Sequence, residues 1–176
     1  KNLISLMKNK EIAGINITVP FKKTIIPYLD ELTLEAKETQ SVNTIYFKDN
    51  RLVGHNTDIG GFQRSIEELK LETTNKIFFI LGAGGVVPSI LFALRKMNVS
   101  KIMISNRTKS KAESLKDLFK DLKIVDWGEV PDFDIIINAT SVGLKKEDEI
   151  NLDFFKFGKN KFFYDVIYNP KETNFL

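Results

Sequence analysis

The sequence contains no cysteine and a single histidine, His55, among its 176 residues. Disulfides and thiolate metal sites are therefore excluded, and a histidine-based zinc site is disfavoured, so we expect no metal. A chain without cysteine suits a reducing compartment, and we expect a cytoplasmic protein. Long apolar runs are also scarce: the longest, residues 77–94, is interrupted by Gly and Pro and is not expected to cross a membrane.

Charge of one sign is not concentrated anywhere in the chain. The net charge of +3 is spread along the sequence, so no nucleic-acid or membrane partner is implied. With 43% hydrophobic and 28% charged residues, the composition is that of a soluble globular protein, expected to be a monomer or homodimer. The chain opens without Met and stops at an apolar Asn174-Phe175-Leu176, which we interpret as a fragment of a longer protein.

The first part of the chain mixes short elements of both kinds. Helical spacing predicts the tail of a helix over residues 3–9, one or two short helices over 24–38 and a helix over 59–71. A strand is expected over 14–19, and alternation over 42–54, with a turn at Asp49-Asn50, predicts a hairpin.

The pattern changes at Thr73-Thr74-Asn75-Lys76, which predicts a domain boundary between residues 1–72 and 73–176. After it, strands are expected at residues 77–81, 102–105, 123–125, 134–138 and 162–166, with helices after the first strand and over 109–121. Strands alternating with helices indicate an α/β fold: a Rossmann-like doubly wound parallel sheet, preceded by part of a smaller α/β substrate-binding domain.

A glycine loop, Gly82-Ala83-Gly84-Gly85-Val86, follows the first of these strands and precedes a helix. In this context Gly82 allows a tight turn, Gly84 lets the backbone approach a pyrophosphate, and the helix N-terminus supplies free amides. The third glycine of the fingerprint is replaced by Val87. The loop predicts a dinucleotide site; the alternative is a purely structural turn.

The end of the next strand indicates which dinucleotide is bound. An NAD site usually places an acid there, but this chain has Asn106, Arg107, Thr108 and, one turn later, Lys111. Arg107 offers a planar fork of donors to a phosphate, so we predict NADP rather than NAD. A solvated basic helix start is the alternative.

Lys22 and Asp58 each end a segment of the first domain, and both can reach one cleft. A lysine held by a carboxylate can donate a proton to a developing alkoxide and take it back in the reverse reaction. Asn16, Thr18, Asn43 and Thr57 add neutral donors and acceptors suited to a small polyhydroxylated ligand. An exposed surface lysine is the alternative for Lys22.

Seven motifs together carry a family resemblance: NITVPFK, SVNT, GHNTDIGG, ILGAGG, NRTKSK, NATSVG and YDVIYNPKETNFL, in that order. From about Gly14 onward the chain resembles the shikimate dehydrogenases, which are NADP-dependent enzymes of aromatic amino acid (chorismate) biosynthesis. The resemblance implies reversible reduction of 3-dehydroshikimate to shikimate.

The resemblance also implies roles for particular residues. Lys22 and Asp58 match the catalytic pair, while Thr18, Asn43, Asp58 and Tyr168 match substrate-binding positions. The cofactor positions are Gly82, Ala83, Gly84, Gly85, Val86, Asn106, Arg107, Thr108, Lys111, Thr140 and Val166, and Ser141 lies in a loop near the cofactor.

Within these motifs, Gln40-Ser41 stands where the family usually has Gly-Ala, and Val86-Val87-Pro88 stands where small residues are usual. Three other interpretations remain open: a quinate/shikimate dehydrogenase of broader specificity, a catalytically silent NADP-binding relative, and a relative of methylene-tetrahydrofolate dehydrogenase. The last lacks the Asn-x-Thr-x-Pro-x-Lys and Asn-Thr-Asp motifs seen here.

Overall fold

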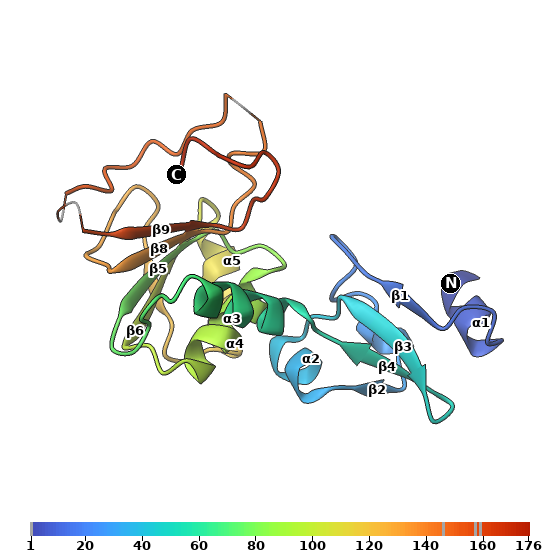
Figure 1. Ribbon diagram of the computed structural model, residues 1–176. Helices are drawn as coiled ribbons and strands as arrows, with labels where there is room; N and C mark the ends of the chain where they lie inside the picture. The colour runs from blue at the N-terminus through green and yellow to red at the C-terminus, as the bar shows by residue number, and fades with distance from the viewer. Residues whose placement is uncertain (1, 146, 157, 159) are drawn as a thin grey trace. The chain divides into compact units, whose positions relative to one another are not determined.

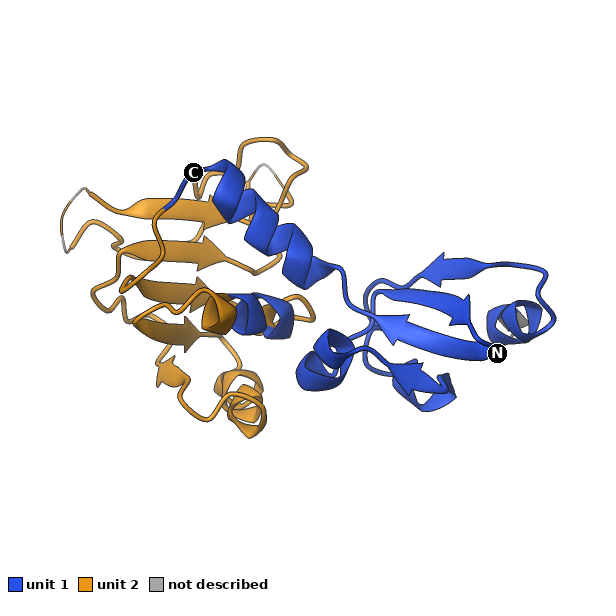
Figure 2. Cartoon of the chain, turned by 60° about the horizontal axis from the view of Figure 1, so that its bottom comes forward, with its two compact units in different colours: residues 1–71, 88–93 blue, residues 72–87, 94–176 orange. Residues whose placement is uncertain are grey.

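The chain folds into two compact units, each with its own β-sheet. The computed structural model describes residues 2–145, 147–156, 158 and 160–176. Unit 1 comprises residues 1–71 with 88–93, and unit 2 comprises residues 72–87 with 94–176; Figure 2 colours them separately. The sequence places a boundary after residue 72 and assigns segment 88–93 to the second domain, whereas the structure groups that segment with unit 1.

Unit 1 is built on a four-stranded sheet with the order β1-β3-β4-β2. Its elements, many of them labelled in Figure 1, are α1 (Asn2–Lys8), β1 (Gly14–Asn16), η1 (Ile26–Tyr28), β2 (Glu31–Leu32), α2 (Leu34–Thr39), β3 (Thr44–Lys48), β4 (Arg51–His55) and α3 (Asp58–Glu68). The expected β3–β4 hairpin is confirmed, and its turn residues Asp49 and Asn50 both adopt positive φ, as a type I′ hairpin turn requires.

Local sequence explains where the helices of unit 1 begin and end. The Thr33 hydroxyl accepts a hydrogen bond from Ala36 N and so caps the start of α2. The same helix ends at Gln40, which adopts the left-handed conformation with φ of 48°. Along α3, Ile59, Phe62 and Ile66 are buried, as the apolar spacing predicts.

The core of unit 1 lies between its sheet and helices. Five fully buried side chains define it, and each contributes about 1.5–3 kcal/mol relative to an exposed position: Met7, Ala36 (less, being small), Val42, Ile45 and Leu52. Aliphatic side chains from β1 and from the segment after it pack around this cluster. The core therefore fixes the strand ends that carry the polar residues described below.

Unit 2 contains a five-stranded sheet with the order β7-β6-β5-β8-β9, in which every pairing is parallel. Its elements are β5 (Ile77–Leu81), α4 (Val87–Lys96, residues 88–93 of which are grouped with unit 1), β6 (Lys101–Ser105), α5 (Lys109–Glu113), η2 (Ser114–Asp117), β7 (Lys123–Val125), β8 (Ile135–Asn138) and β9 (Phe162–Asp165). The predicted Rossmann-like α/β class is thereby confirmed.

Aromatic side chains dominate one core of unit 2. Phe163 on β9 packs against Phe175 in a tilted arrangement, with ring centroids 5.3 Å apart, and meets Phe154 edge to face at 5.8 Å. Phe133 contacts Phe163 edge to face and lies beside Phe79 on β5. Such pairs add about 0.5–1.5 kcal/mol each beyond burial, so they hold the C-terminal segment onto the sheet.

Three elements differ from the sequence-based expectation. The strand expected over 14–19 ends at Asn16, because the chain then enters a turn that is closed by a hydrogen bond from Phe21 N to Thr18 O. The region 24–38, predicted as helix, contains the two-residue strand β2, paired with β4. The helix expected over 109–121 tightens into η2 after Glu113, where the Ser114 hydroxyl bonds to the Lys111 carbonyl.

Candidate active site

Unit 1 holds a close ion pair between Lys22 and Asp58. Lys22 Nζ lies 2.7 Å from Asp58 Oδ2, and the two side chains are only 16% and 23% exposed. Asp58 is the first residue of α3, and the carbonyl of Lys22 accepts a hydrogen bond from Val42 N, so both backbones are anchored to the sheet region. The structure therefore brings together the two residues predicted to form the catalytic pair.

Asn43 orients the carboxylate of that pair. Its Nδ2 donates to Asp58 Oδ1 at 2.8 Å and to Thr57 Oγ1 at 2.8 Å. Its Oδ1 accepts from Thr57 N at 2.9 Å and from the Thr44 hydroxyl at 3.1 Å, which fixes the orientation of the amide. Asn43 is thus in direct contact with Asp58, as expected for two residues that bind one ligand.

A residue that the sequence did not single out, Asn56, lies behind the pair. It is 1% exposed, and its Oδ1 accepts a hydrogen bond from Asp58 N at 3.0 Å. Its Nδ2 donates to Ser41 O, to the Ser89 hydroxyl and, more weakly at 3.3 Å, to Thr39 Oγ1. The only sequence signal for this role is a polar residue placed just before a helix start.

This arrangement can hold and deliver one proton. A lysine ammonium hydrogen-bonded to a carboxylate is held in position, and it can protonate an oxygen that develops negative charge nearby. Because Asn43 and Lys22 occupy both oxygens of Asp58, the carboxylate has little freedom to rotate away. The geometry suits acid–base chemistry on a small polar ligand.

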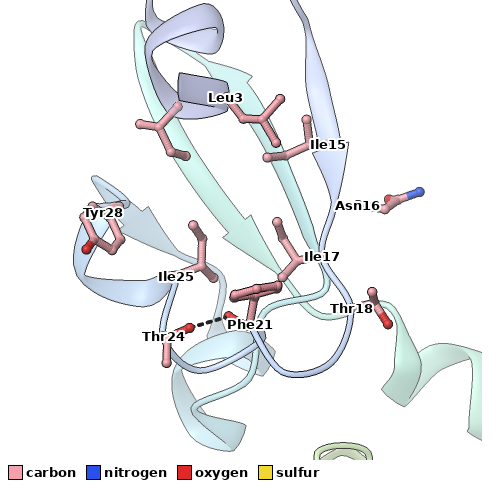
Figure 3. Close-up of a pocket in the computed structure, with 10 residues that line it drawn as sticks. Leu3, Ile15, Asn16, Ile17, Thr18, Phe21, Thr24, Ile25 and Tyr28 are labelled. Atoms are coloured by element: carbon pink, nitrogen blue, oxygen red, sulfur yellow. Dashed lines mark hydrogen bonds between the residues drawn. The ribbon is translucent and has the colours of Figure 1, made fainter. Parts of the chain in front are cut away.

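Thr18 lies at the edge of a separate, largely apolar cavity of about 630 Å³ in unit 1. Figure 3 shows Ile15, Ile17, Ile25 and Phe21 gathered around this cavity, with the Asn16 side chain pointing away from them. The chain turns just after Thr18, and the Val19–Pro20 peptide bond is cis. The substrate-binding role predicted for Thr18 stays a prediction.

The glycine loop of unit 2 has one constrained glycine and two open ones. Gly82 has φ of +104°, and a Cβ there would lie 2.6 Å from the Ala139 carbonyl oxygen. Gly82 N also donates to Ser105 O at 2.8 Å, which links the turn to β6. Gly84 and Gly85 are exposed, and no atom lies closer than 3.9 Å to a Cβ built on either. Their backbone is therefore accessible to a ligand.

The loop leads into the N-terminus of α4, a helix of ten residues. Val87 is fully buried as its first residue, and Pro88 occupies the first turn, where a missing N–H costs nothing. Ala83 precedes the two open glycines and Val86 follows them, and both residues are half-buried. An accessible glycine backbone ahead of a helix N-terminus fits the phosphates of a dinucleotide.

The segment after β6 presents basic side chains to solvent. Arg107, Thr108 and Lys111 are exposed, and Asn106 Nδ2 donates to Thr108 O at 2.8 Å, which shapes the turn into α5. Lys109 differs, because its Nζ lies 2.5 Å from Asp126 Oδ1. The hydrogen bond and the charge of Asp126 raise the pKa of Lys109 above its usual value.

Thr140 and Val166 are positioned by a polar network at the carboxyl ends of β8 and β9. Asn138 Oδ1 accepts from both the backbone N and the hydroxyl of Thr140, and Asn138 O accepts from Val166 N. Asn138 Nδ2 donates to Asp165 Oδ2 on the neighbouring strand. Tyr168 follows in this segment and is 91% exposed. Sequence reasoning did not single out Asn138 or Asp165.

Metal and membrane features are not found in the described part of the chain. Among the described residues, no three His, Cys, Asp or Glu side chains gather in a way that would hold a metal ion. None of the described helices combines the length and the apolar character needed to cross a bilayer.

Comparison with known proteins supports this architecture. A family model described as "Shikimate dehydrogenase substrate binding domain" matches residues 1–45, and one described as "Shikimate / quinate 5-dehydrogenase" matches residues 64–151. A curated "Shikimate dehydrogenase (NADP(+))" from Pelagibacter ubique is 58% identical over 176 residues, covering 100% of this chain and 66% of the relative.

Two solved structures are similar in both fold and sequence. A shikimate dehydrogenase in complex with NADP+ matches with a TM-score of 0.90 and 34% identity, over 99% of this chain and 64% of its own. Quinate dehydrogenase from Corynebacterium glutamicum, in complex with NAD, matches with a TM-score of 0.90 and 29% identity, over 99% of this chain and 66% of its own. The chain thus spans just under two thirds of the length of these relatives.

A parallel sheet with an open glycine loop, in a chain that also carries a small unit with a half-buried Lys–Asp pair, defines a two-unit α/β protein of the dinucleotide-binding class. The chain belongs to the shikimate/quinate dehydrogenase family, whose model matches half of its length. The resemblance carried by the seven motifs is thereby confirmed.

Proposed function

We propose that this protein catalyses the NADP-dependent, reversible reduction of 3-dehydroshikimate to shikimate. The observation that carries the proposal is the Lys22–Asp58 ion pair, 2.7 Å long, with Asn43 bound to the second carboxylate oxygen. The curated relative with 58% identity bears the name of this enzyme.

Lys22 is the proton donor in the proposed reaction. NADPH, when bound, supplies the hydride that reduces the ketone carbon. The Lys22 ammonium gives one proton to the ketone oxygen, so the carbonyl becomes an alcohol, and the neutral amine regains a proton from water. In the oxidation of shikimate, the amine of Lys22 takes the hydroxyl proton instead. Asp58 holds Lys22 at the position where this transfer occurs.

Substrate and cofactor contacts complete the proposal. Thr18, Asn43, Asp58 and Tyr168 are proposed to bind the substrate hydroxyls, which suits their hydroxyl, amide and carboxylate groups. The cofactor phosphates are proposed to lie against the open backbone of residues 82–86 and the exposed basic residues of segment 106–111, with Thr140 and Val166 nearby. Arg107 and Lys111 favour the additional phosphate of NADP. A cytoplasmic monomer or homodimer is part of this proposal.

The test is an oxidation assay on the protein at the full length that its gene encodes. Shikimate and NADP are mixed, and the appearance of NADPH absorbance is followed for the wild type, Lys22→Ala and Lys23→Ala. Lys23 is an exposed neighbour and serves as the matched control. We expect Lys22→Ala to lose about 10²–10⁴-fold in kcat while NADP binding persists. Unchanged turnover in Lys22→Ala would overturn the assignment of the proton donor.

A second candidate is a quinate/shikimate dehydrogenase that also uses NAD. The similarity to the quinate dehydrogenase from Corynebacterium glutamicum favours it. Turnover measured with shikimate and quinate, each with NADP and NAD, separates the two. A protein that binds NADP but turns over neither alcohol would instead be a silent relative.

A further inference from the structure

The sole tryptophan of the chain, Trp127, lies just beyond the carboxyl end of β7 and has no role in the site described so far. It is 37% exposed, so part of the indole packs on the protein and part faces solvent. A half-covered aromatic ring on an ordered turn is the form that a stacking platform for a planar ligand takes.

The strand register brings Trp127 to the same edge as the basic cofactor segment. Ser105 on β6 pairs with Val125 on β7, and these are the last residues of their strands. Arg107 and Trp127 each follow two residues later, so both leave the sheet just past the same rung. Ligands of open α/β sheets bind outside this carboxyl edge.

The turn that carries Trp127 is tightly specified. Glu129 N donates to Asp126 O at 3.1 Å, and Gly128 has φ of +104°, so residues 126–129 form a closed turn with Trp127 at its second position. The Lys109–Asp126 ion pair ties this turn to the start of α5. The two loops that follow β6 and β7 are therefore joined by a direct contact.

The same ion pair engages one of the basic side chains of the segment after β6. Lys109 is engaged by Asp126, whereas the exposed Arg107 and Lys111 face solvent. A guanidinium can cover one face of a purine and an indole can cover another part of it, while a lysine nearby meets a phosphate. The chemistry at this edge suits an adenosine that bears a phosphate on its ribose.

We propose that Trp127 forms a wall of the adenine subsite and contacts the adenine ring of the bound cofactor, opposite or beside Arg107. This inference rests on the proposed function, because it assigns the base of the same dinucleotide. It commits Trp127 to binding alone, with no part in the proton transfer.

A single tryptophan makes the binding test direct. The intrinsic fluorescence of the chain is titrated with NADP, with 2′,5′-ADP, which is the adenosine half, and with nicotinamide mononucleotide, which is the other half. We expect saturable changes with NADP and 2′,5′-ADP, and none with nicotinamide mononucleotide. Dissociation constants for the same ligands are measured by calorimetry.

Variants then separate contact from an indirect effect. Trp127→Ala is expected to weaken 2′,5′-ADP binding about tenfold, and Trp127→Phe to recover most of the affinity, since stacking depends on the aromatic face. Circular dichroism checks that each variant is folded, and Trp127→Phe keeps the test valid if Trp127→Ala unfolds.

The outcomes distinguish this inference from the proposed function. If calorimetry detects 2′,5′-ADP binding but Trp127→Ala, or Trp127→Leu should the alanine variant unfold, binds with an unchanged dissociation constant, the adenine subsite is elsewhere and the proposed function still stands. If neither NADP nor 2′,5′-ADP binds to the wild-type protein at the full length that its gene encodes, both proposals are wrong.

Discussion

Lys22 Nζ lies 2.7 Å from Asp58 Oδ2 although the two residues are 36 positions apart in the sequence. The remaining oxygen, Oδ1, accepts a hydrogen bond from Asn43, so the carboxylate is held from both sides. A charge-assisted bond that is largely shielded from water fixes the lysine more firmly than an exposed surface pair does. The pair therefore acts as one unit in the predictions that follow.

Replacing Asp58 by Asn should impair turnover with little change in the fold. The amide keeps the shape of the side chain but removes the charge that holds the Lys22 ammonium in place. We expect kcat to fall by about 10²–10⁴-fold in steady-state kinetics. Asp49→Asn, in the exposed hairpin turn, is the control and should match the wild type. A kcat for Asp58→Asn within twofold of the wild type would contradict the role of the pair.

Gly82→Ala should destabilise the protein. The residue has φ of +104°, and a Cβ would meet the Ala139 carbonyl oxygen at 2.6 Å, so both the backbone and its neighbour must shift. We expect the free energy of unfolding to fall by about 1–3 kcal/mol in urea denaturation. Gly85→Ala, in the same loop but with open space around the added methyl, is the control. Equal stability of the two variants would show that the turn is not strained by a side chain.

Ser41→Ala should stabilise the protein. The Ser41 hydroxyl is buried and has no hydrogen-bond partner among the described residues, so its removal relieves a desolvation cost of about 1 kcal/mol. The Thr39 hydroxyl is equally buried but bonds to Glu35 O and to Asn56, so Thr39→Val should destabilise by a similar amount. In urea denaturation, the free energy of unfolding should rise in Ser41→Ala and fall in Thr39→Val if hydrogen bonding, rather than packing, decides the outcome.

The Asp148 carboxylate should stabilise the fold at neutral pH and lose this effect in strong acid. Its Oδ2 accepts hydrogen bonds from Lys145 N and Gly143 N, which lower the pKa of the carboxyl below its usual 3.8. A depressed pKa in the folded state gives stability that is complete above pH 3.8 and lost as the pH falls through the folded value.

The measurement compares thermal unfolding of the wild type and Asp148→Asn across pH. The wild type should be the more stable at neutral pH, and the difference should shrink below pH 3.8. Glu149→Gln, an exposed neighbour, should show no such convergence. A difference that stays constant down to strongly acidic pH would mean that the carboxylate charge is not involved.

The sequence predicts the sheet of unit 2 well because its central strands β5 and β8 are largely apolar runs, which parallel strands buried on both faces require. Strands β5 and β7 have the predicted bounds, and β6, β8 and β9 differ by one residue. The two-residue strand β2 is not predictable in this way. Glu31-Leu32 is too short to show alternation, and only its pairing with β4 makes it a strand.

The residues of the candidate site also divide into those that the sequence predicts and those that it does not. Lys22 and Asp58 are recognisable because each lies in one of the motifs that carry the family resemblance, whereas spacing alone leaves a surface lysine as the alternative for Lys22. Asn56 is not recognisable from the sequence, because its role depends on four hydrogen bonds. Three are to residues distant in the sequence, and the fourth is to the backbone N of Asp58. Buried polar networks depend on tertiary placement, which no local pattern encodes.

The carboxamide of Asn56 has a consequence for how this family can change over time. It joins Asp58 N to the hydroxyl of Ser89, which lies 33 residues beyond Asn56 in the chain, and the residues Asn56 and Ser89 are both almost fully buried. A change of position 89 to a residue that cannot accept a hydrogen bond leaves the Asn56 amide with one partner fewer. A change at position 56 removes a partner from Asp58 N, from Ser41 O and from the hydroxyls of Ser89 and Thr39. Substitutions at positions 56 and 89 are therefore expected to occur in pairs among related genes, with Asp58 unchanged.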